Sequence, residues 1–191
     1  MNNLPLIIIA GGKSSRMKRD KALLPFEGYN SLAEYQYRRF QPFFKKVYIS
    51  AKNNKFDFPM ELIEDCYSDS SPLVALISIF DTLKEVDEVF ILSVDSPFVE
   101  IEIFKKLSDE AEESSDIVVA HSPNGVEPLC AIYRRSMLDI AKDMIGKNSH
   151  KLQILLEQVN TQKVYFKSKK SFMNLNYPSD YELAKDLFSN I

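Results

Sequence analysis

Short apolar runs rich in β-branched residues alternate with amphipathic stretches along almost the whole chain, and no other feature restricts the fold as strongly. The clearest run is Glu88–Ser93, in which the four central residues are all apolar, as in a strand that is covered on both faces. Strands that alternate with helices form βαβ units, in which neighbouring strands run parallel. We therefore expect an α/β fold of three layers around a mostly parallel sheet.

The same pattern predicts the individual elements. A turn is expected at 123–125, where Pro, Asn and Gly follow one another. No repeat, linker or low-complexity segment interrupts the series, so residues 1–191 should form a single domain. The expected strands are 4–10, 46–50, 61–63, 88–93, 116–120, 129–133 and 163–166, and the expected helices are 31–43, 72–83, 101–112, 136–145, 151–158 and 179–188.

Charge and composition argue against several classes of protein. The net charge of −3 is unusual for a general nucleic-acid binder, which normally presents a basic face, so we expect no nucleic-acid partner. No stretch approaches the ~20 consecutive apolar residues of a membrane helix, so no membrane partner is expected either. Cys66 and Cys130 form no CxxC pair and suggest no disulfide framework, which predicts a reducing, cytoplasmic setting.

In parallel sheets, ligands bind beyond the carboxyl ends of the strands, and the first such place is the segment after Ala10. Gly11 and Gly12 let the backbone turn sharply and approach a ligand, and Arg16 and Lys21 supply countercharge for a polyphosphate. The spacing matches neither a Walker A loop nor GxGxxG. The alternative is an ordinary turn with solvated lysines.

The second such place follows the apolar strand 88–93. Asp95 lies directly beyond this strand, where a carboxylate can hold Mg²⁺ against phosphate oxygens, and Pro97 stops the strand. A D-x-P sequence is also common in turns and helix caps, which is the alternative for Asp95. The isolated His121 and His150 have no partner at metal-ligand spacing, so a zinc mechanism has no support.

Three further segments contain candidate site residues. Asp65 follows the short strand 61–63, although it could be a plain cap or loop residue. Glu127 precedes the strand 129–133, and the alternative for it is an edge glutamate without a function. Asn174 and Asn176 stand two residues apart on an expected extended segment, so both side chains could face one site. By contrast, we assign the aromatic residues of the helix 31–43 and the Cys130 thiol to the core.

These segments resemble one family in order along nearly the whole chain. The string IAGGKSSRMKRDKALL resembles the LAGGxSxRMGxDK signature of nucleotidyltransferases, and its double glycine is the form found in molybdenum cofactor guanylyltransferases. The D-x-P, E-D, E-P-x-x-A and N-x-N-x-P segments are similar to later motifs of that family. Four residues depart from the pattern: Lys18, Ser71 and Ala75 stand at or near positions where glycines are expected, and Tyr177 replaces the threonine that caps the last helix. Ser179 is then the expected cap.

The resemblance implies a Rossmann-related, glycosyltransferase-A-like fold and transfer of GMP from GTP to molybdenum-molybdopterin, with release of pyrophosphate. Mg²⁺ is the implied cofactor, and molybdoenzymes or their chaperones would receive the product. The roles that it implies for residues of this chain are nucleotide binding by Ile9, Ala10, Gly11, Gly12 and Asp65, phosphate binding by Arg16 and Lys21, metal binding by Asp95, and contact with the acceptor by Glu127, Asn174 and Asn176, of which Asn176 is also a second candidate metal ligand.

Two other functions remain open at this point. A cytidylyltransferase or a sugar-phosphate nucleotidyltransferase would use the same scaffold, because backbone contacts around 9–12 rather than residue types select the base. A regulatory module that binds nucleotide without turnover is the other possibility. The joint presence of Arg16, Lys21 and Asp95 argues against such a module, which could do without the metal carboxylate.

Overall fold

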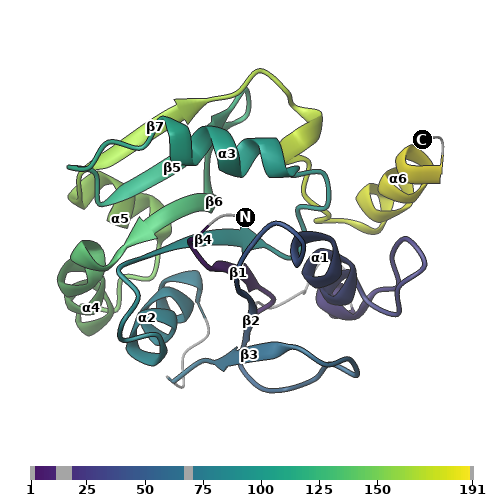
Figure 1. The fold of residues 1–191 in the computed structure, drawn as a ribbon, viewed down its shortest axis with the longest axis horizontal. Helices are drawn as coiled ribbons and strands as arrows, with labels where there is room; N and C mark the ends of the chain where they lie inside the picture. Colours follow the sequence, from purple (N-terminus) through teal and green to yellow (C-terminus); the bar gives the residue numbers. More distant parts are fainter. Residues whose placement is uncertain (1–2, 12–18, 67–70, 190–191) are drawn as a thin grey trace.

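A mixed sheet forms the middle layer of the protein, as the computed structural model shows for residues 3–11, 19–66 and 71–189 (Figure 1). In this part of the chain the sheet has seven strands in the order β3-β2-β1-β4-β6-β5-β7. β6 runs antiparallel to β4 and β5, and the remaining pairings are parallel, which confirms the mostly parallel sheet. The strands are β1 Leu6–Ile9, β2 Val47–Ala51, β3 Glu61–Glu64, β4 Glu88–Ser93, β5 Ile117–Ser122, β6 Gly125–Arg134 and β7 Thr161–Tyr165.

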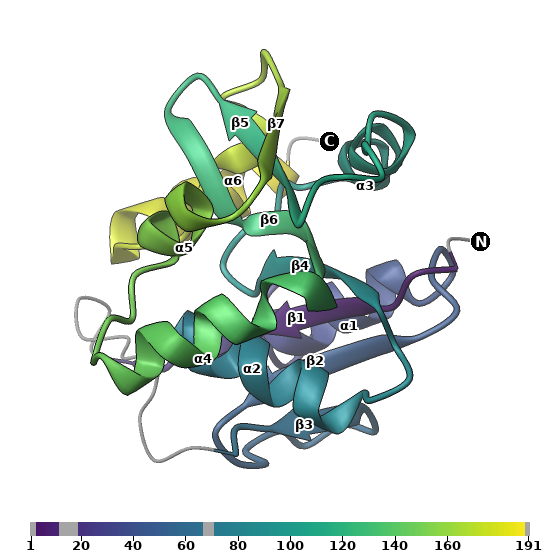
Figure 2. The same ribbon diagram turned by 90° about the vertical axis from the view of Figure 1, so that its left-hand side faces the viewer.

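Helices cover both faces of the sheet, and Figure 2 shows α2, α4 and α5 on one side and α1 and α3 on the other. Short 3-10 helices η1, η2 and η3 span Lys21–Leu23, Arg135–Met137 and Lys170–Phe172. The α-helices are α1 Leu32–Phe40, α2 Pro72–Thr82, α3 Ile101–Asp109, α4 Leu138–Gly146, α5 Leu152–Gln158 and α6 Pro178–Ser189.

The central strands divide the core into two apolar clusters. In β4, Phe90 and Leu92 pack with α1 and α3, whereas Val89 and Ile91 pack with α2 and α4. All four side chains are fully buried, because successive residues of a strand point to opposite faces and both faces are covered. The uninterrupted apolar run in the sequence is explained by this position.

β6 starts four residues earlier than the sequence suggested. It forms a tight hairpin with β5 in which Ser122 pairs with Gly125, and Gly125 has a φ of 122° that favours glycine. The pairing then breaks, since Val119 pairs with Ala131 while Ala120 pairs with Glu127. Pro128 lies in this irregular stretch, where a residue without an N–H group is tolerated. The expected strand 129–133 is therefore only the regular second half of β6.

The last helix begins at Pro178, so the prediction that Ser179 caps it is wrong. The Asp180 carboxylate, from inside the first turn, instead accepts hydrogen bonds from the backbone N–H groups of Asn176 (3.0 Å) and Tyr177 (2.8 Å). An acidic residue in the first turn can accept hydrogen bonds from the backbone N–H groups that precede a helix. Tyr177, whose side chain cannot cap the helix, is therefore tolerated before Pro178. Among the helices described, none is both long and apolar enough to span a membrane.

Candidate functional site

The candidate site lies where the parallel strands β1 and β4 end side by side. Ile9 pairs with Ser93 at the last position of the two strands, so the chain leaves both strands at the same edge of the sheet. Ala10 remains tied to β2 through its N–H bond to the Ser50 carbonyl (2.8 Å). The two places singled out in the sequence, after Ala10 and after Ser93, are therefore neighbours in space.

Asp95 is held at this edge by contacts on both carboxylate oxygens. The Ser93 hydroxyl donates to Oδ1 at 2.6 Å, and the Lys21 ammonium donates to Oδ2 at 2.7 Å. Only 16% of each of the Lys21 and Asp95 side chains is exposed. Their ion pair is therefore largely shielded from water, which makes it stronger than a surface pair.

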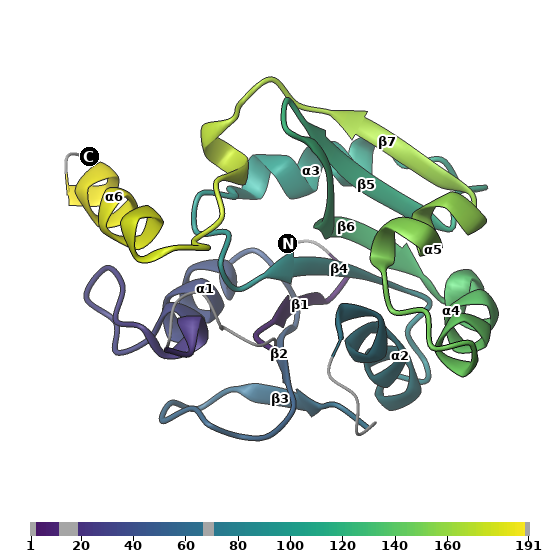
Figure 3. The same ribbon diagram turned by 180° about the vertical axis from the view of Figure 1, so that it is seen from behind.

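The C-terminal segment returns to the same place. Figure 3 shows the chain passing from β7 to α6 close to the carboxyl end of β4, and the Leu175 N–H donates to the Asp95 carbonyl at 2.9 Å. The Asn176 Oδ1 atom accepts from the Lys21 ammonium at 2.8 Å. The Asn174 Oδ1 atom accepts from the Ser96 hydroxyl at 2.6 Å. The structure thus brings both asparagines to the segment around Asp95.

Lys21 consequently bridges two oxygen atoms that could also ligate a metal ion. A carboxylate and an amide carbonyl are suitable ligands for a hard divalent cation, and here both converge on one positive charge, that of the ammonium. Among the residues that the structure describes, no group of three or more His, Cys, Asp or Glu side chains could hold a metal. A metal at Asp95 would therefore need the Asn176 oxygen, water or substrate to complete its ligands.

Lys55 joins the two ends of the basic segment and was not identified from the sequence. Its ammonium donates to the Ala10 carbonyl at 3.0 Å and to Asp20 Oδ2 at 2.5 Å. The other Asp20 oxygen accepts from the Ala22 N–H at 3.0 Å and caps η1, which carries Lys21. Nothing in the sequence around Lys55 points to this contact. The predicted Gly12 and Arg16, together with Lys18, lie outside the described residues.

A small pocket of about 50 Å³ lies beside Gly11 and Asp65. Burial raises the pKa of Asp65, although the Ser50 hydroxyl and the Lys52 ammonium oppose this effect. The Asp65 Oδ1 atom is buried and has no hydrogen-bond partner among the described residues. A ligand N–H group could satisfy this oxygen. The lining residues are Ile9, Gly11, Ser50, Lys52, Asp65, Ser71, Pro72 and Ala75.

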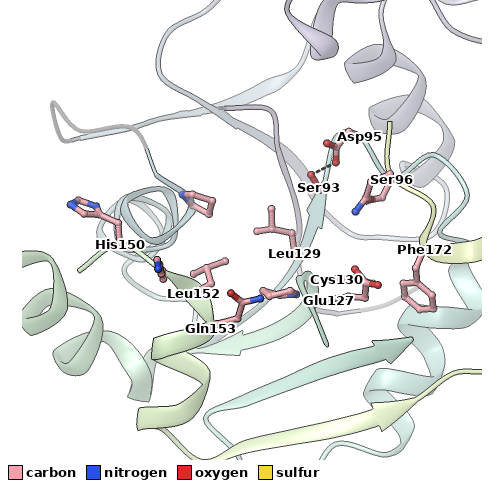
Figure 4. Close-up of a pocket in the computed structure, with 14 residues that line it drawn as sticks. Ser93, Asp95, Ser96, Glu127, Leu129, Cys130, His150, Leu152, Gln153 and Phe172 are labelled. Carbon is pink, nitrogen blue, oxygen red and sulfur yellow. Dashed lines mark hydrogen bonds between the residues drawn. The ribbon is translucent and has the colours of Figure 1, made fainter. Parts of the chain in front are cut away.

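A larger cavity of about 380 Å³ shares the lining residue Pro72 with the small pocket (Figure 4). Figure 4 shows Ser93 and Asp95 on one side of this cavity and Leu152 and Gln153 of α5 on the other. The sequence did not single out the part of the lining contributed by α5 and the residues before it. The lining residues are Pro72, Ser93, Asp95, Ser96, Glu127, Pro128, Leu129, Cys130, His150, Lys151, Leu152, Gln153, Phe172 and Asn174.

Glu127 and Cys130 of β6 both line the larger cavity. The Ser122 hydroxyl donates to Glu127 Oε1 at 2.7 Å. Burial raises the pKa of Glu127, while Ser122 and His121 oppose this effect. Burial also raises the pKa of Cys130 strongly, so its thiol is no nucleophile, as expected for a core residue. Glu127 is thus placed at a cavity that also contains Asp95 and Asn174.

The two pockets at the carboxyl edge of the sheet lie where open α/β folds, nucleotide-binding folds among them, bind their ligands. A solved structure of a molybdopterin-guanine dinucleotide biosynthesis protein A from Archaeoglobus fulgidus has the same fold, with a TM-score of 0.85 and 20% identity over 98% of this chain and 100% of that chain. The model of the MobA-like NTP transferase domain matches residues 6–163.

Two curated relatives are similar over nearly their full length. A molybdenum cofactor guanylyltransferase of Campylobacter jejuni is 37% identical over 187 residues, which are 97% of each chain. A protein of the same name from Helicobacter pylori is 33% identical over 189 residues, covering 96% of this chain and 92% of its own. The chain belongs to the MobA-like NTP transferase domain family and is a nucleotidyltransferase. The family that the sequence motifs indicated is confirmed.

Proposed function

We propose that this protein transfers GMP from GTP to molybdenum-molybdopterin. The observation that carries this proposal is the position of the Lys21–Asp95–Asn176 cluster beside the larger cavity and at the strand edge that also leads to the Gly11 pocket. One pocket can take the nucleotide and the other the acceptor. The names of the relatives from Campylobacter jejuni and Helicobacter pylori support the same reaction.

The nucleotide is assigned to the Gly11 side. The buried Asp65 oxygen offers an acceptor for an N–H or O–H group of the nucleotide. A Cβ atom added at Gly11 would lie 4.0 Å from Asp65 Oδ2, in ordinary van der Waals contact, so the glycine leaves this side of the pocket without a side chain. Ile9, Ala10 and Gly12 would contribute backbone contacts, and Arg16 and Lys21 would bind the phosphates.

The acceptor is assigned to the larger cavity, with Glu127 and Asn174 in its lining and Asn176 beside it. The terminal phosphate of molybdopterin would form a new bond to the α-phosphorus of GTP. The bond from this phosphorus to its bridging oxygen would break, and pyrophosphate would leave with the electron pair. Such a displacement depends on alignment and charge neutralisation, and it needs no covalent bond to the protein.

The cation that we propose is Mg²⁺. The Lys21 ammonium already occupies a position between Asp95 Oδ2 and Asn176 Oδ1, so this pair of oxygens is suited to a positive charge. When bound, Mg²⁺ would neutralise charge on the phosphate oxygens. Asp95 would be its main protein ligand and Asn176 the second. Lys21 would then turn toward the phosphates, for which its ammonium is a suitable donor.

Pyrophosphate release tests the proposal. With molybdenum-molybdopterin present, GTP should support release and CTP, ATP and UTP should not. Release from CTP at an equal or higher rate would instead identify a cytidylyltransferase on the same scaffold. Binding of nucleotide without release from any triphosphate would identify a regulatory module. Transfer of the product to molybdoenzymes or their chaperones, in the cytoplasm, belongs to the same proposal.

A further inference from the structure

Gln36, on the central turn of α1, contacts the segment that contains Asp95. Its side chain is fully buried. The amide nitrogen donates to the Val94 carbonyl at 3.2 Å and to the Ser96 carbonyl at 3.0 Å. These two carbonyls belong to the residues on either side of Asp95. One side chain therefore holds the backbone before and after the carboxylate.

Arg39 continues this contact one turn further along α1. Its guanidinium donates to the carbonyls of Pro97 and Val99. The guanidinium carbon lies 4.4 Å from the centre of the Phe40 ring and 5.0 Å from that of Tyr35, so the guanidinium group packs against both aromatic rings. Gln36 and Arg39 together bind four carbonyls of the segment 94–99.

Packing alone does not explain a glutamine at position 36. A buried amide must lose its hydration, and the Gln36 Oε1 atom has no hydrogen-bond partner in the part of the chain described. An apolar side chain of similar length would fill the same space between the apolar residues of this core without that cost. What the amide provides, and an apolar side chain cannot, is the pair of hydrogen bonds to the carbonyls on either side of Asp95.

We propose that Gln36, assisted by Arg39, is a positioning residue for Asp95. By fixing the backbone on both sides of Asp95, Gln36 keeps Oδ2 directed toward the position that Lys21 now occupies. This inference rests on the proposed function, in which that position receives the metal ion. Gln36 itself touches neither the metal nor the substrates.

Arg135 provides a matched control at the opposite edge of the sheet. Its guanidinium donates to the carbonyls of Phe80, Leu83 and Val86 at the end of α2, with distances between 2.6 and 3.2 Å. This side chain therefore also holds several carbonyls of one segment, but at the end of α2 that precedes β4. Arg135→Met should lower stability without affecting Asp95.

The test measures Mn²⁺ binding to the nucleotide-free protein through paramagnetic broadening of the NMR signals of residues 93–96. Gln36→Met removes the donors and keeps the side-chain length. We expect this variant to require about 10- to 100-fold more Mn²⁺ for half-maximal broadening, the usual range for residues that orient a metal ligand. The affinity of Gln36→Met for GTP without metal should stay unchanged. In Arg135→Met, the signals of residues 93–96 should broaden at the same Mn²⁺ concentration as in the wild type.

Asp95→Asn separates this inference from the function on which it depends. If Asp95→Asn shifts the Mn²⁺ midpoint and Gln36→Met does not, the positioning role is wrong and the metal assignment stands. If neither variant shifts the midpoint, both are wrong. Equal shifts in Gln36→Met and Arg135→Met would reduce Gln36 to a general structural role. Should Gln36→Met fail to fold, Arg39→Lys gives the same comparison. This variant keeps the charge but loses the planar guanidinium group that donates to two carbonyls at once.

Discussion

At the scale of single residues, Lys21 connects two distant segments of the site. Its ammonium donates to Asp95 and Asn176, which lie 74 and 155 residues further along the chain. Both bonds satisfy acceptors that would otherwise be partly buried without a donor. In the proposed reaction the ammonium changes partners, from these oxygens to the phosphates, while a cation takes its place. Substitution of Lys21 should therefore change mainly the affinity for GTP, and substitution of Asp95 should change mainly the turnover.

Lys21→Ala should weaken GTP binding. The loss of one charge-assisted hydrogen bond typically costs about 1.5–3 kcal/mol, which corresponds to roughly 10- to 100-fold in affinity. Calorimetric titration with GTP measures this effect, and Lys147→Ala, which removes an exposed ion pair with Asp143 at the end of α4, is the control. Unchanged GTP affinity in Lys21→Ala would mean that the ammonium only stabilises Asp95.

Asp95→Asn should reduce turnover more than GTP affinity. Asparagine keeps the size and one oxygen but loses the charge that would hold Mg²⁺, and a bound cation contributes several kcal/mol to the transition state. We therefore expect kcat to fall by about 100-fold or more and the Kd for GTP to change far less. Steady-state kinetics and a thermal melt check this. Near-normal kcat at ordinary Mg²⁺ concentrations would place the metal elsewhere.

The raised pKa of Asp65 predicts a pH dependence of stability. The folded state binds a proton at Asp65 more tightly than the unfolded state, so its contribution to stability is present at low pH and is lost as the pH rises through the folded pKa. Asp65→Asn lacks this titration, and its Tm relative to wild type should rise as the pH increases above about 4, the usual pKa of an aspartate in an unfolded chain. A relative Tm that falls over this range would show that Lys52 and Ser50 outweigh burial.

At the scale of elements, the start of α2 shows how a departure from the family pattern is tolerated. Ser71 stands where glycine is expected, and its hydroxyl accepts from the Val74 N–H at 3.2 Å, with Pro72 at the first helical position. Serine and glycine are both favoured N-cap residues. The substitution therefore preserves the cap beside the small pocket, and α1 begins in the same way at Ser31.

Ser71→Ala and Ser71→Gly should consequently differ. Loss of a serine cap to alanine costs about 1 kcal/mol of stability, whereas replacement by glycine costs only a few tenths. Denaturant unfolding measures both variants, and Ser31→Ala, which removes the cap of α1, is the reference. Equal destabilisation by alanine and glycine would show that Ser71 acts mainly through its contact with the His150 ring at 3.2 Å.

At the scale of the whole molecule, the two apolar clusters make the sheet a rigid base for a site built from distant segments. β1, β4, β6 and the segment before α6 each contribute residues to one edge. Ligands that connect such segments stabilise the folded state by mass action, by about 2.7 kcal/mol when the ligand is present at 100 times its Kd.

GTP with Mg²⁺ should therefore raise the Tm. For a chain of this size each kcal/mol corresponds to a shift of about 2–4 °C, so saturating GTP should give roughly 5–10 °C. CTP at the same concentration should give a smaller shift, because the double glycine resembles the guanylyl branch. A melting series with four nucleotides measures this, and equal shifts with CTP would contradict guanine selection.

The sequence by itself determined the α/β class, the order of the strands and α-helices and the family. Local periodicity and short motifs carry this information, because burial on both faces requires an apolar run such as 89–92, and glycines and Asp95 sit directly at strand ends. It also placed Asp65, Glu127, Asn174 and Asn176 among the candidates, although their roles remain predictions.

Only the tertiary structure decided which side chains meet. Lys55 contacts Ala10 and Asp20, and Gln36 contacts the carbonyls around Asp95. These contacts join distant segments, and no sequence motif links those segments to one another. The antiparallel direction of β6 and the cavity beside α5 likewise follow from how the chain closes around two cores. A hydrogen bond between distant residues depends on positions set by the packing of the whole fold, and local sequence does not encode those positions.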